Sequence, residues 1–295
     1  MGELYALTSA GGAPGTTTAA IALALTWPSP VIVAECDPSG GDILAGLLAG
    51  HVPARRGLME LAIEAGRSYA AATAGLPGQL VPLAEDQNTM VLPGLTDPRQ
   101  AAGLGPAWPA VASALTAQRA DVIADCGRLD PSAEAPLGVL AAARAVVIVV
   151  RPSLRQVWAA RPRVDMLLAL HADASRLALL VTGEGSYSRH EVAQALGLPV
   201  AAVLPHDART AALLSDGVGR RRGLLTSPLL RSASAAGRAL RTHWPSPATG
   251  EAPEESAPGE HAADFAIAAA SRAAAVQGGA GPAEAGPWKG SRGDD

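Results

Sequence analysis

The chain has 295 residues, of which 48% are hydrophobic, 17% are charged and 3% are aromatic, and its formal net charge is -4. The apolar content can bury a sizeable core, so a wholly disordered chain is excluded. An acidic balance does not favour broad, non-specific contact with nucleic acid or with an anionic membrane. The single lysine, Lys289, lies near the C-terminal end, so no lysine is available to a site in the folded core.

Three further features of the sequence narrow the class of protein. The two cysteines are too few for a disulfide framework or a four-cysteine zinc site. No uninterrupted apolar run reaches the roughly 18–20 residues that a membrane span needs, and the N-terminus lacks the basic start of a signal peptide. We therefore expect a soluble cytoplasmic protein.

The composition changes near residue 244, which predicts two regions. Residues 1–244 alternate apolar runs with alanine-rich stretches, whereas residues 245–295 consist largely of Pro, Gly, Ala, Glu and Ser. A segment of the second kind cannot bury enough apolar surface to offset its conformational entropy. The expected organisation is one folded domain, 1–244, followed by a disordered tail, 245–295.

Within the first region, strand-like and helix-like segments alternate. Strands are predicted at residues 4–8, 31–35, 90–92, 122–125, 146–150, 177–181 and 201–204. Helices are predicted at residues 17–26, 57–65, 108–118, 133–142, 154–170, 189–196 and 208–215. Continuous apolar strands joined by helices are typical of an α/β, doubly wound, mostly parallel sheet with helices on both faces. Ligands of such sheets bind beyond the carboxyl ends of the strands.

The first strand runs into a small-residue loop and then an alanine-rich helix. The loop reads SAGGAPGTTT at residues 9–18. Glycines allow backbone N–H groups to converge, and a helix N-terminus favours an anion, so this arrangement can hold phosphate. Compared with the pattern G-x-x-x-x-G-K-[ST], Gly15 and Thr17 are in place, but Ala10 replaces the first glycine and Thr16 replaces the lysine. The same residues also fit a glycine-rich turn with a threonine cap.

Two aspartates follow other strands of the predicted sheet. Asp37 begins the run DPSGGD after the second strand, and Asp125 ends the strand that contains VIAD. Mg²⁺ bound to phosphates is usually held by one or two carboxylates and a hydroxyl. Either aspartate alone could equally be a loop or helix cap.

In their order along the chain, these segments resemble the ParA/MinD family of P-loop NTPases. Asp37 to Gly40 resembles the D-P-Q-G segment of that family, Asp125 its Walker B aspartate, and the segment from Gly197 to Asp207 its "G-I-P-V … I-P-x-D" end. The loop at residues 9–18 is similar to that of an actinobacterial MinD-like subgroup, S-V-K-G-S-P-G-V-T-T. The resemblance covers about residues 3 to 240 and implies a P-loop NTPase fold.

The resemblance also implies a site, a ligand and a partner. Mg²⁺ would be held by Thr17 and Asp125, and Asp37 would take the catalytic role of orienting water or the switch segment. ATP would be bound by Gly11, Gly12, Ala13, Pro14, Gly15, Thr16, Thr17, Thr18, Pro205 and Asp207. The implied partner is a second copy of the chain in a homodimer, and the roles implied are partitioning, positioning or assembly.

Two departures from the family pattern bear on catalysis. Gly11 stands where the family has the lysine that reaches the nucleotide of the dimer partner, and Thr16 stands where it has the lysine that contacts the β- and γ-phosphates. Because a phosphate-directed cation supplies much of the rate in phosphoryl transfer, we expect hydrolysis to be slow or absent. The alternative is a pseudo-NTPase scaffold that binds no nucleotide and acts in localising a pilus or secretion assembly. A Rossmann oxidoreductase is disfavoured because no G-x-G-x-x-G motif is present.

Two smaller features have open interpretations. Arg220, Arg221 and Arg222 could contact DNA phosphates, lipid or an acidic partner, or could form a solvated loop. Cys36 and Cys126, next to the two aspartates, could form a redox pair or act as two small buried apolar residues.

Overall fold

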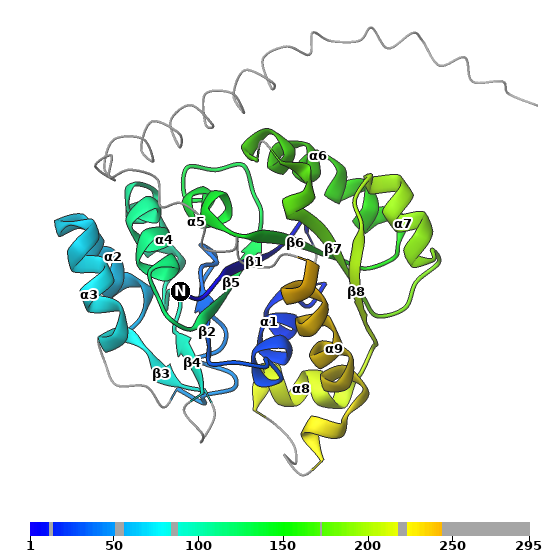
Figure 1. Ribbon diagram of the computed structural model, residues 1–295, viewed down its shortest axis with the longest axis horizontal. Helices are drawn as coiled ribbons and strands as arrows, with labels where there is room; N and C mark the ends of the chain where they lie inside the picture. Colours follow the sequence, from blue (N-terminus) through cyan, green and yellow to red (C-terminus); the bar gives the residue numbers. More distant parts are fainter. Residues whose placement is uncertain (12–13, 51–55, 84–87, 172, 218–222, 244–295) are drawn as a thin grey trace, which may run out of the picture.

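The computed structural model describes residues 1–11, 14–50, 56–83, 88–171, 173–217 and 223–243 (Figure 1). The described residues form an eight-stranded sheet in the order β3-β4-β2-β5-β1-β6-β7-β8. Only β3, at one edge, is antiparallel to its neighbour. The strands are β1 (Leu4–Ser9), β2 (Val31–Glu35), β3 (Val81–Pro82), β4 (Thr89–Leu92), β5 (Asp121–Arg128), β6 (Ala145–Val150), β7 (Leu177–Thr182) and β8 (Val200–Leu204).

Helices cover both faces of the sheet. Alternate residues of β1 point to opposite faces: Leu4 and Ala6 belong to one core, and Tyr5 and Leu7 to the other. Figure 1 shows α1, α8 and α9 together on one face and α4, α5 and α6 on the other. The helices are α1 (Thr16–Leu25), α2 (Leu58–Arg67), α3 (Tyr69–Gln79), α4 (Trp108–Thr116), α5 (Leu137–Ala142), α6 (Leu154–Leu170), α7 (Arg189–Leu196), α8 (Ala208–Asp216) and α9 (Pro228–His243), with short 3-10 turns at Pro98–Gly103, Gly105–Ala107, Ala174–Arg176 and Leu224–Thr226.

The three central strands bring the predicted site residues to one edge of the sheet. In the parallel register, Asp125 of β5 lies between Leu7 of β1 and Glu35 of β2. The loop after β1 and the turn after β2 therefore begin on either side of the end of β5. The strands β1, β2 and β5 thus lie near the centre of the sheet.

All seven predicted strands and all seven predicted helices are present, with bounds that differ by a few residues, and the α/β doubly wound prediction is confirmed. Three elements were missed. The strand β3 has two residues, and α3 contains Pro77. The helix α9 begins with a proline, and its buried residues Leu229, Ala233, Ala236 and Leu240 do recur at helical spacing. The boundary at residue 244 and the tail at 245–295 lie outside the described residues, so the domain division remains a prediction.

Candidate functional site

The loop between β1 and α1 is shaped by one glycine. Gly15 has φ 94° and ψ 37°, a left-handed conformation that disfavours residues with a side chain. Its carbonyl accepts a hydrogen bond from the N–H of Ala19 at 2.8 Å, which starts α1. The Thr182 hydroxyl at the end of β7 donates to the carbonyl of Pro14 at 2.7 Å and ties the loop to the sheet. The N–H groups of the first turn of α1 are thus left facing outward, as an anion site requires.

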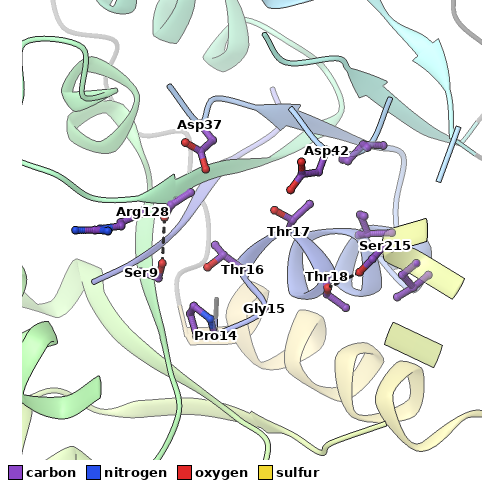
Figure 2. Close-up of a pocket in the computed structure, with 14 residues that line it drawn as sticks. Ser9, Pro14, Gly15, Thr16, Thr17, Thr18, Asp37, Asp42, Arg128 and Ser215 are labelled. Carbon is purple, nitrogen blue, oxygen red and sulfur yellow. Dashed lines mark hydrogen bonds between the residues drawn. The ribbon is translucent and has the colours of Figure 1, made fainter. Parts of the chain in front are cut away.

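A cavity of about 300 Å³ opens over this loop (Figure 2). That volume is at the lower end of the range for small-molecule sites, roughly 300–1,000 Å³. Figure 2 shows the carboxylates of Asp37 and Asp42 pointing toward the start of α1. The lining residues are Ser9, Pro14, Gly15, Thr16, Thr17, Thr18, Ile21, Asp37, Asp42, Ile43, Gly127, Arg128, Leu214 and Ser215.

Thr16 places a buried hydroxyl without a partner in this lining. The residue is 6% exposed, and no group among the described residues makes a hydrogen bond to its Oγ1. A buried polar atom without a hydrogen bond costs about 1–3 kcal/mol. A ligand oxygen in the cavity would remove that cost.

Asp125 lies beneath the cavity beside Thr17. Burial raises the pKa of this carboxyl to about 6, while hydrogen bonds from the Thr17 side chain and the Gly127 N–H act in the opposite direction. The Gly127 N–H donates to Asp125 Oδ1 at 3.0 Å. A hydroxyl and a carboxylate in contact are oxygen ligands of the kind that Mg²⁺ prefers.

Asp37 packs directly against the end of β5. A Cβ added to Gly127, which has φ 55°, would lie 1.8 Å from Asp37 Oδ2, so only glycine leaves room for this carboxylate. The N–H of Ser39 donates to Asp37 Oδ1 at 2.7 Å. Burial is the largest cause that raises the pKa of Asp37, the Ser39 hydrogen bonds lower it, and the charge of Asp42 raises it again.

Glu35 holds the turn that follows Asp37, a role that the sequence did not reveal. Its Oε1 accepts from the N–H of Ile43 at 2.8 Å, and its Oε2 accepts from the N–H of Gly94 at 2.9 Å. Burial raises the pKa of Glu35 to about 7, and these backbone hydrogen bonds partly counter the rise. By fixing Ile43, Glu35 also fixes the neighbouring Asp42 at the wall of the cavity.

Positive charge is scarce around the site. Within the described lining, Arg128 is the one basic side chain, and it lies at the rim with 55% of its side chain exposed. Its Nε is 3.0 Å from Asp130 Oδ1. Arg151 and Arg155, which follow β6, are exposed and do not line the cavity.

The structure gathers most of the predicted site residues. Pro14, Gly15, Thr16, Thr17, Thr18 and Asp37 line one cavity, and Asp125 lies beneath it. Gly12 and Ala13 lie outside the described residues, and Gly11, with φ 159°, is not in the lining. The triplet Arg220, Arg221 and Arg222 also lies outside the described residues.

The predicted residues Pro205 and Asp207 lie elsewhere. Asp207 caps α8, accepting from the Thr210 N–H at 3.0 Å and from its hydroxyl at 2.7 Å, and neither Pro205 nor Asp207 is in the cavity lining. The other end of α8 reaches the cavity instead: Ser215 Oγ lies 3.4 Å from Thr18 Oγ1. No local pattern in the sequence marks Ser215 as a site residue, because the packing of α8 on α1 brings it there.

The two cysteines are free and fully buried, with 0% exposure each. Burial raises the pKa of both thiols, and nearby negative charges add to the rise. A protonated, inaccessible thiol is a poor nucleophile, so the geometry favours the structural interpretation over the redox pair.

The residues present fit a nucleotide with Mg²⁺. The described residues hold no cluster of three His, Cys, Asp or Glu side chains that could bind a metal. The unpartnered Thr16 hydroxyl, the outward-facing N–H groups and the Thr17–Asp125 pair are complementary to that ligand. No helix in the described part of the chain is long and apolar enough to cross a membrane.

Comparison with known proteins gives structural neighbours only. No protein-family model matches the sequence, and no curated protein does. The septum site-determining protein MinD of Pyrococcus horikoshii, complexed with Mg-ADP, has a TM-score of 0.63 and 17% identity, covering 81% of this chain and 96% of that one. MinD of Pyrococcus furiosus, a cell division ATPase, has a TM-score of 0.61 and 17% identity, with coverages of 82% and 99%. A ParA family ATPase of Chlorobium tepidum has a TM-score of 0.61 and 16% identity, with coverages of 81% and 99%.

At these identities the likeness establishes the fold, and the fold is the Rossmann-like one of the MinD and ParA ATPases. The expected likeness to that fold is confirmed. The likeness of the loop to an actinobacterial subgroup, the site residues and the activity remain predictions.

The buried carboxyls predict how stability depends on pH. Glu35 and Asp125 hold protons more tightly in the folded state, at pKa values of about 7 and about 6, than at their ordinary values of 4.5 and 3.8. Because folded chains must release these protons as pH rises from 5 to 8, the free energy of unfolding should fall over that range. The Glu35 share is on the order of 3 kcal/mol. Urea unfolding midpoints measured at several pH values test this, and Glu35→Gln should flatten the slope. An equal slope in both proteins would contradict it.

Proposed function

We propose that this chain binds ATP together with Mg²⁺ in the cavity over the loop between β1 and α1. The observation that carries the proposal is the meeting of a glycine-bent loop, a helix N-terminus and the Thr17–Asp125 pair at one cavity. A helix N-terminus favours phosphate, and the hydroxyl and carboxylate favour a hard divalent cation. Few other ligands combine both requirements.

Each residue has a stated task in this proposal. The N–H groups at the start of α1 and the Thr16 hydroxyl would donate to phosphate oxygens. Thr17 and Asp125 would hold Mg²⁺, which when bound offsets phosphate charge. Asp37, held over the cavity by Ser39, would orient a water or the turn that follows it.

Hydrolysis should be slow or absent. The described lining supplies one cation, Arg128, and that side chain is mostly exposed and lies next to Asp130. Neutral N–H and O–H donors stabilise phosphate in the ground state, but they add little as charge shifts during transfer. A loop with threonine in the place of lysine would therefore bind ATP but hydrolyse it slowly.

For the cellular role we infer partitioning, positioning or assembly of a cargo. The support is the likeness of fold to proteins named for septum-site determination and cell division. The second candidate is a scaffold that binds no nucleotide, such as one localising a pilus or secretion assembly. The scarcity of cations around the cavity favours it, and absence of ATP binding at millimolar concentration would select it.

We further propose that the chain forms a homodimer through the start of α6. Because β6 is parallel to β1, α6 begins at the same edge of the sheet as the cavity. Leu154 and Trp158, one helical turn apart, are 63% and 80% exposed. Large apolar side chains exposed side by side mark an interaction surface, and this one adjoins the proposed site.

Replacing Thr17 with Ala tests the metal assignment. The variant should bind ATP in the presence of Mg²⁺ roughly 10- to 100-fold more weakly, as loss of a metal-site contact typically does, because the hydroxyl ligand is lost. Isothermal titration with and without Mg²⁺ measures this. Thr26→Ala is the matched control, since the Thr26 hydroxyl lies at the other end of α1, where it donates to the Ala22 carbonyl at 2.9 Å, and its removal should change affinity little. Equal affinities for the wild type and Thr17→Ala would refute the assignment.

Restoring a cation tests the expectation of slow hydrolysis. Lysine at Gly11 would be strained by its φ of 159°, so the informative change is Thr16→Lys at the first residue of α1. It should raise ATP turnover by on the order of 10²–10³, the magnitude typical of one charge-stabilising donor. Thr18→Lys adds the same charge two residues further along α1, where the side chain faces Ser215, and it should not raise turnover. If the wild type already turns over as fast as Thr16→Lys, the reasoning from the missing lysine is wrong.

The dimer is tested by sedimentation velocity with and without Mg-ATP. A change of Trp158→Ser should weaken self-association at least about tenfold, since a buried tryptophan often dominates an interface. Leu225→Ser, at a residue that is 64% exposed near the start of α9, is the control and should leave association unchanged. A chain that stays monomeric at all concentrations, or equal effects of both changes, would contradict the interface.

A further inference from the structure

Arg128 and Asp130 form an ion pair at the rim of the candidate cavity. Arg128 is the last residue of β5 and the one basic residue in the described lining. Its Nε lies 3.0 Å from Asp130 Oδ1, and the two side chains are 55% and 48% exposed. Figure 2 shows the guanidinium of Arg128 pointing away from Thr16. The residue thus borders the cavity, but its charge is directed away from the start of α1.

The backbone that carries this pair is fixed, so an exchange of partners involves the side chains. Arg128 is the register partner of Ser9 at the end of β1, and the N–H of Leu129 donates to the Ser9 carbonyl at 2.8 Å. Leu129 itself is fully buried. The Arg128 N–H also donates a hydrogen bond to the Asp37 carboxylate. The side chain of Arg128 therefore starts from a fixed point beside the loop that begins at Ser9.

A second arginine remains next to Asp130 if Arg128 leaves. Arg163 of α6 places its Nη2 3.5 Å from the same oxygen, Asp130 Oδ1. Its Nε donates to the carbonyl of Leu129 at 3.2 Å, and its side chain is 24% exposed, against 55% for Arg128. Asp130 still has a cation beside it after Arg128 leaves, so an unpaired charge does not oppose the release of Arg128.

We propose that Arg128 binds phosphate in the candidate site and that Asp130 competes for it: the guanidinium leaves Asp130 when ATP binds and donates to phosphate oxygens. This inference rests on the proposed function, because it takes the phosphates to lie in that cavity. A guanidinium binds phosphate through two parallel, charge-assisted hydrogen bonds, and these are stronger in a partly enclosed cavity than in the solvent around Asp130. Asp130 is a positioning residue that holds Arg128 outside the empty cavity and lowers the affinity for ATP.

Isothermal titration with ATP and Mg²⁺ on single and double variants tests the assignment. Arg128→Gln should weaken binding at least about tenfold, as loss of a hydrogen bond between charged groups does. Asp130→Asn should strengthen binding by about two- to fivefold, because a weak, exposed competitor is removed. In the Arg128→Gln background, Asp130→Asn should have no effect, since Asp130 acts on ATP only through Arg128.

Two exposed ion pairs elsewhere supply matched controls. Arg99 pairs with Asp97, also two residues away along the chain, and neither lines the cavity. Arg99→Gln removes the same charge as Arg128→Gln and should leave the affinity unchanged. Asp165→Asn removes an exposed carboxylate of α6 that lies beside Arg161, and it should likewise have no effect.

An NMR spectrum of the arginine Nε–H groups shows where the guanidinium lies with and without ATP. The Arg128 signal is identified by its loss in Arg128→Gln. Without ligand, Asp130→Asn should shift this signal, because the ion pair is broken. At saturation with ATP and Mg²⁺, the Arg128 signals of the wild type and of Asp130→Asn should coincide, because both guanidinium groups then contact phosphate.

Four outcomes overturn the inference. Equal affinity of the wild type and Arg128→Gln, where Thr17→Ala still weakens binding, means that Arg128 does not contact the ligand and leaves the proposed function intact. A gain from Asp130→Asn that is absent, or that is equal in both backgrounds, means that Asp130 does not compete for Arg128. Arg128 signals that still differ at saturation mean that the ion pair persists in the complex. Absence of ATP binding by both the wild type and Asp130→Asn overturns this inference and the proposed function together.

Discussion

The candidate site depends on how closely the carboxyl ends of β2 and β5 approach each other. Asp37 can lie over the end of β5 only because Gly127 has no side chain, and the left-handed conformation of Gly127 likewise favours glycine. Glu35, the register partner of Asp125 on the neighbouring strand, then holds the turn that carries Asp42 and Ile43. A larger residue at position 127 would displace Asp37 and with it the wall of the cavity.

This close approach has an electrostatic consequence. Asp37 and Asp42 both act to raise the pKa of Asp125, in addition to the main effect of burial. Repulsion between buried carboxylates raises their pKa values and so disfavours the ionised form. A divalent cation relieves that repulsion. The acid-rich wall thus favours phosphate that arrives with its metal over free phosphate, whose charge it would repel.

Much of the fold was predictable from the sequence, because the strands are short runs of apolar, mostly β-branched or Leu residues that the sheet buries on both faces. Asp125 in β5, Asp37 after β2 and Thr17 at the start of α1 could be assigned to one edge from topology alone. Ser215 and Ile43 could not, since they reach the cavity through the packing of α8 on α1 and through the hydrogen bonds of Glu35. The helix α9 was not predicted, although its buried residues Leu229, Ala233, Ala236 and Leu240 recur at helical spacing.

The residue at position 16 bears on the proposed function. A lysine at this position would carry its charge to the end of a flexible chain, free to follow the phosphates as charge shifts. Threonine instead places a short hydroxyl at the helix start, buried and without a partner among the described residues. Its hydrogen-bonding capacity is satisfied only when an acceptor lies in the cavity, and it is satisfied equally before and after any bond is cleaved. A hydrogen bond that is equally strong in the bound ground state and in the transition state tightens binding but leaves the activation barrier of the bound complex unchanged. Under the proposed function the loop would therefore retain its ligand, and fast hydrolysis would need a cation in addition to Arg128.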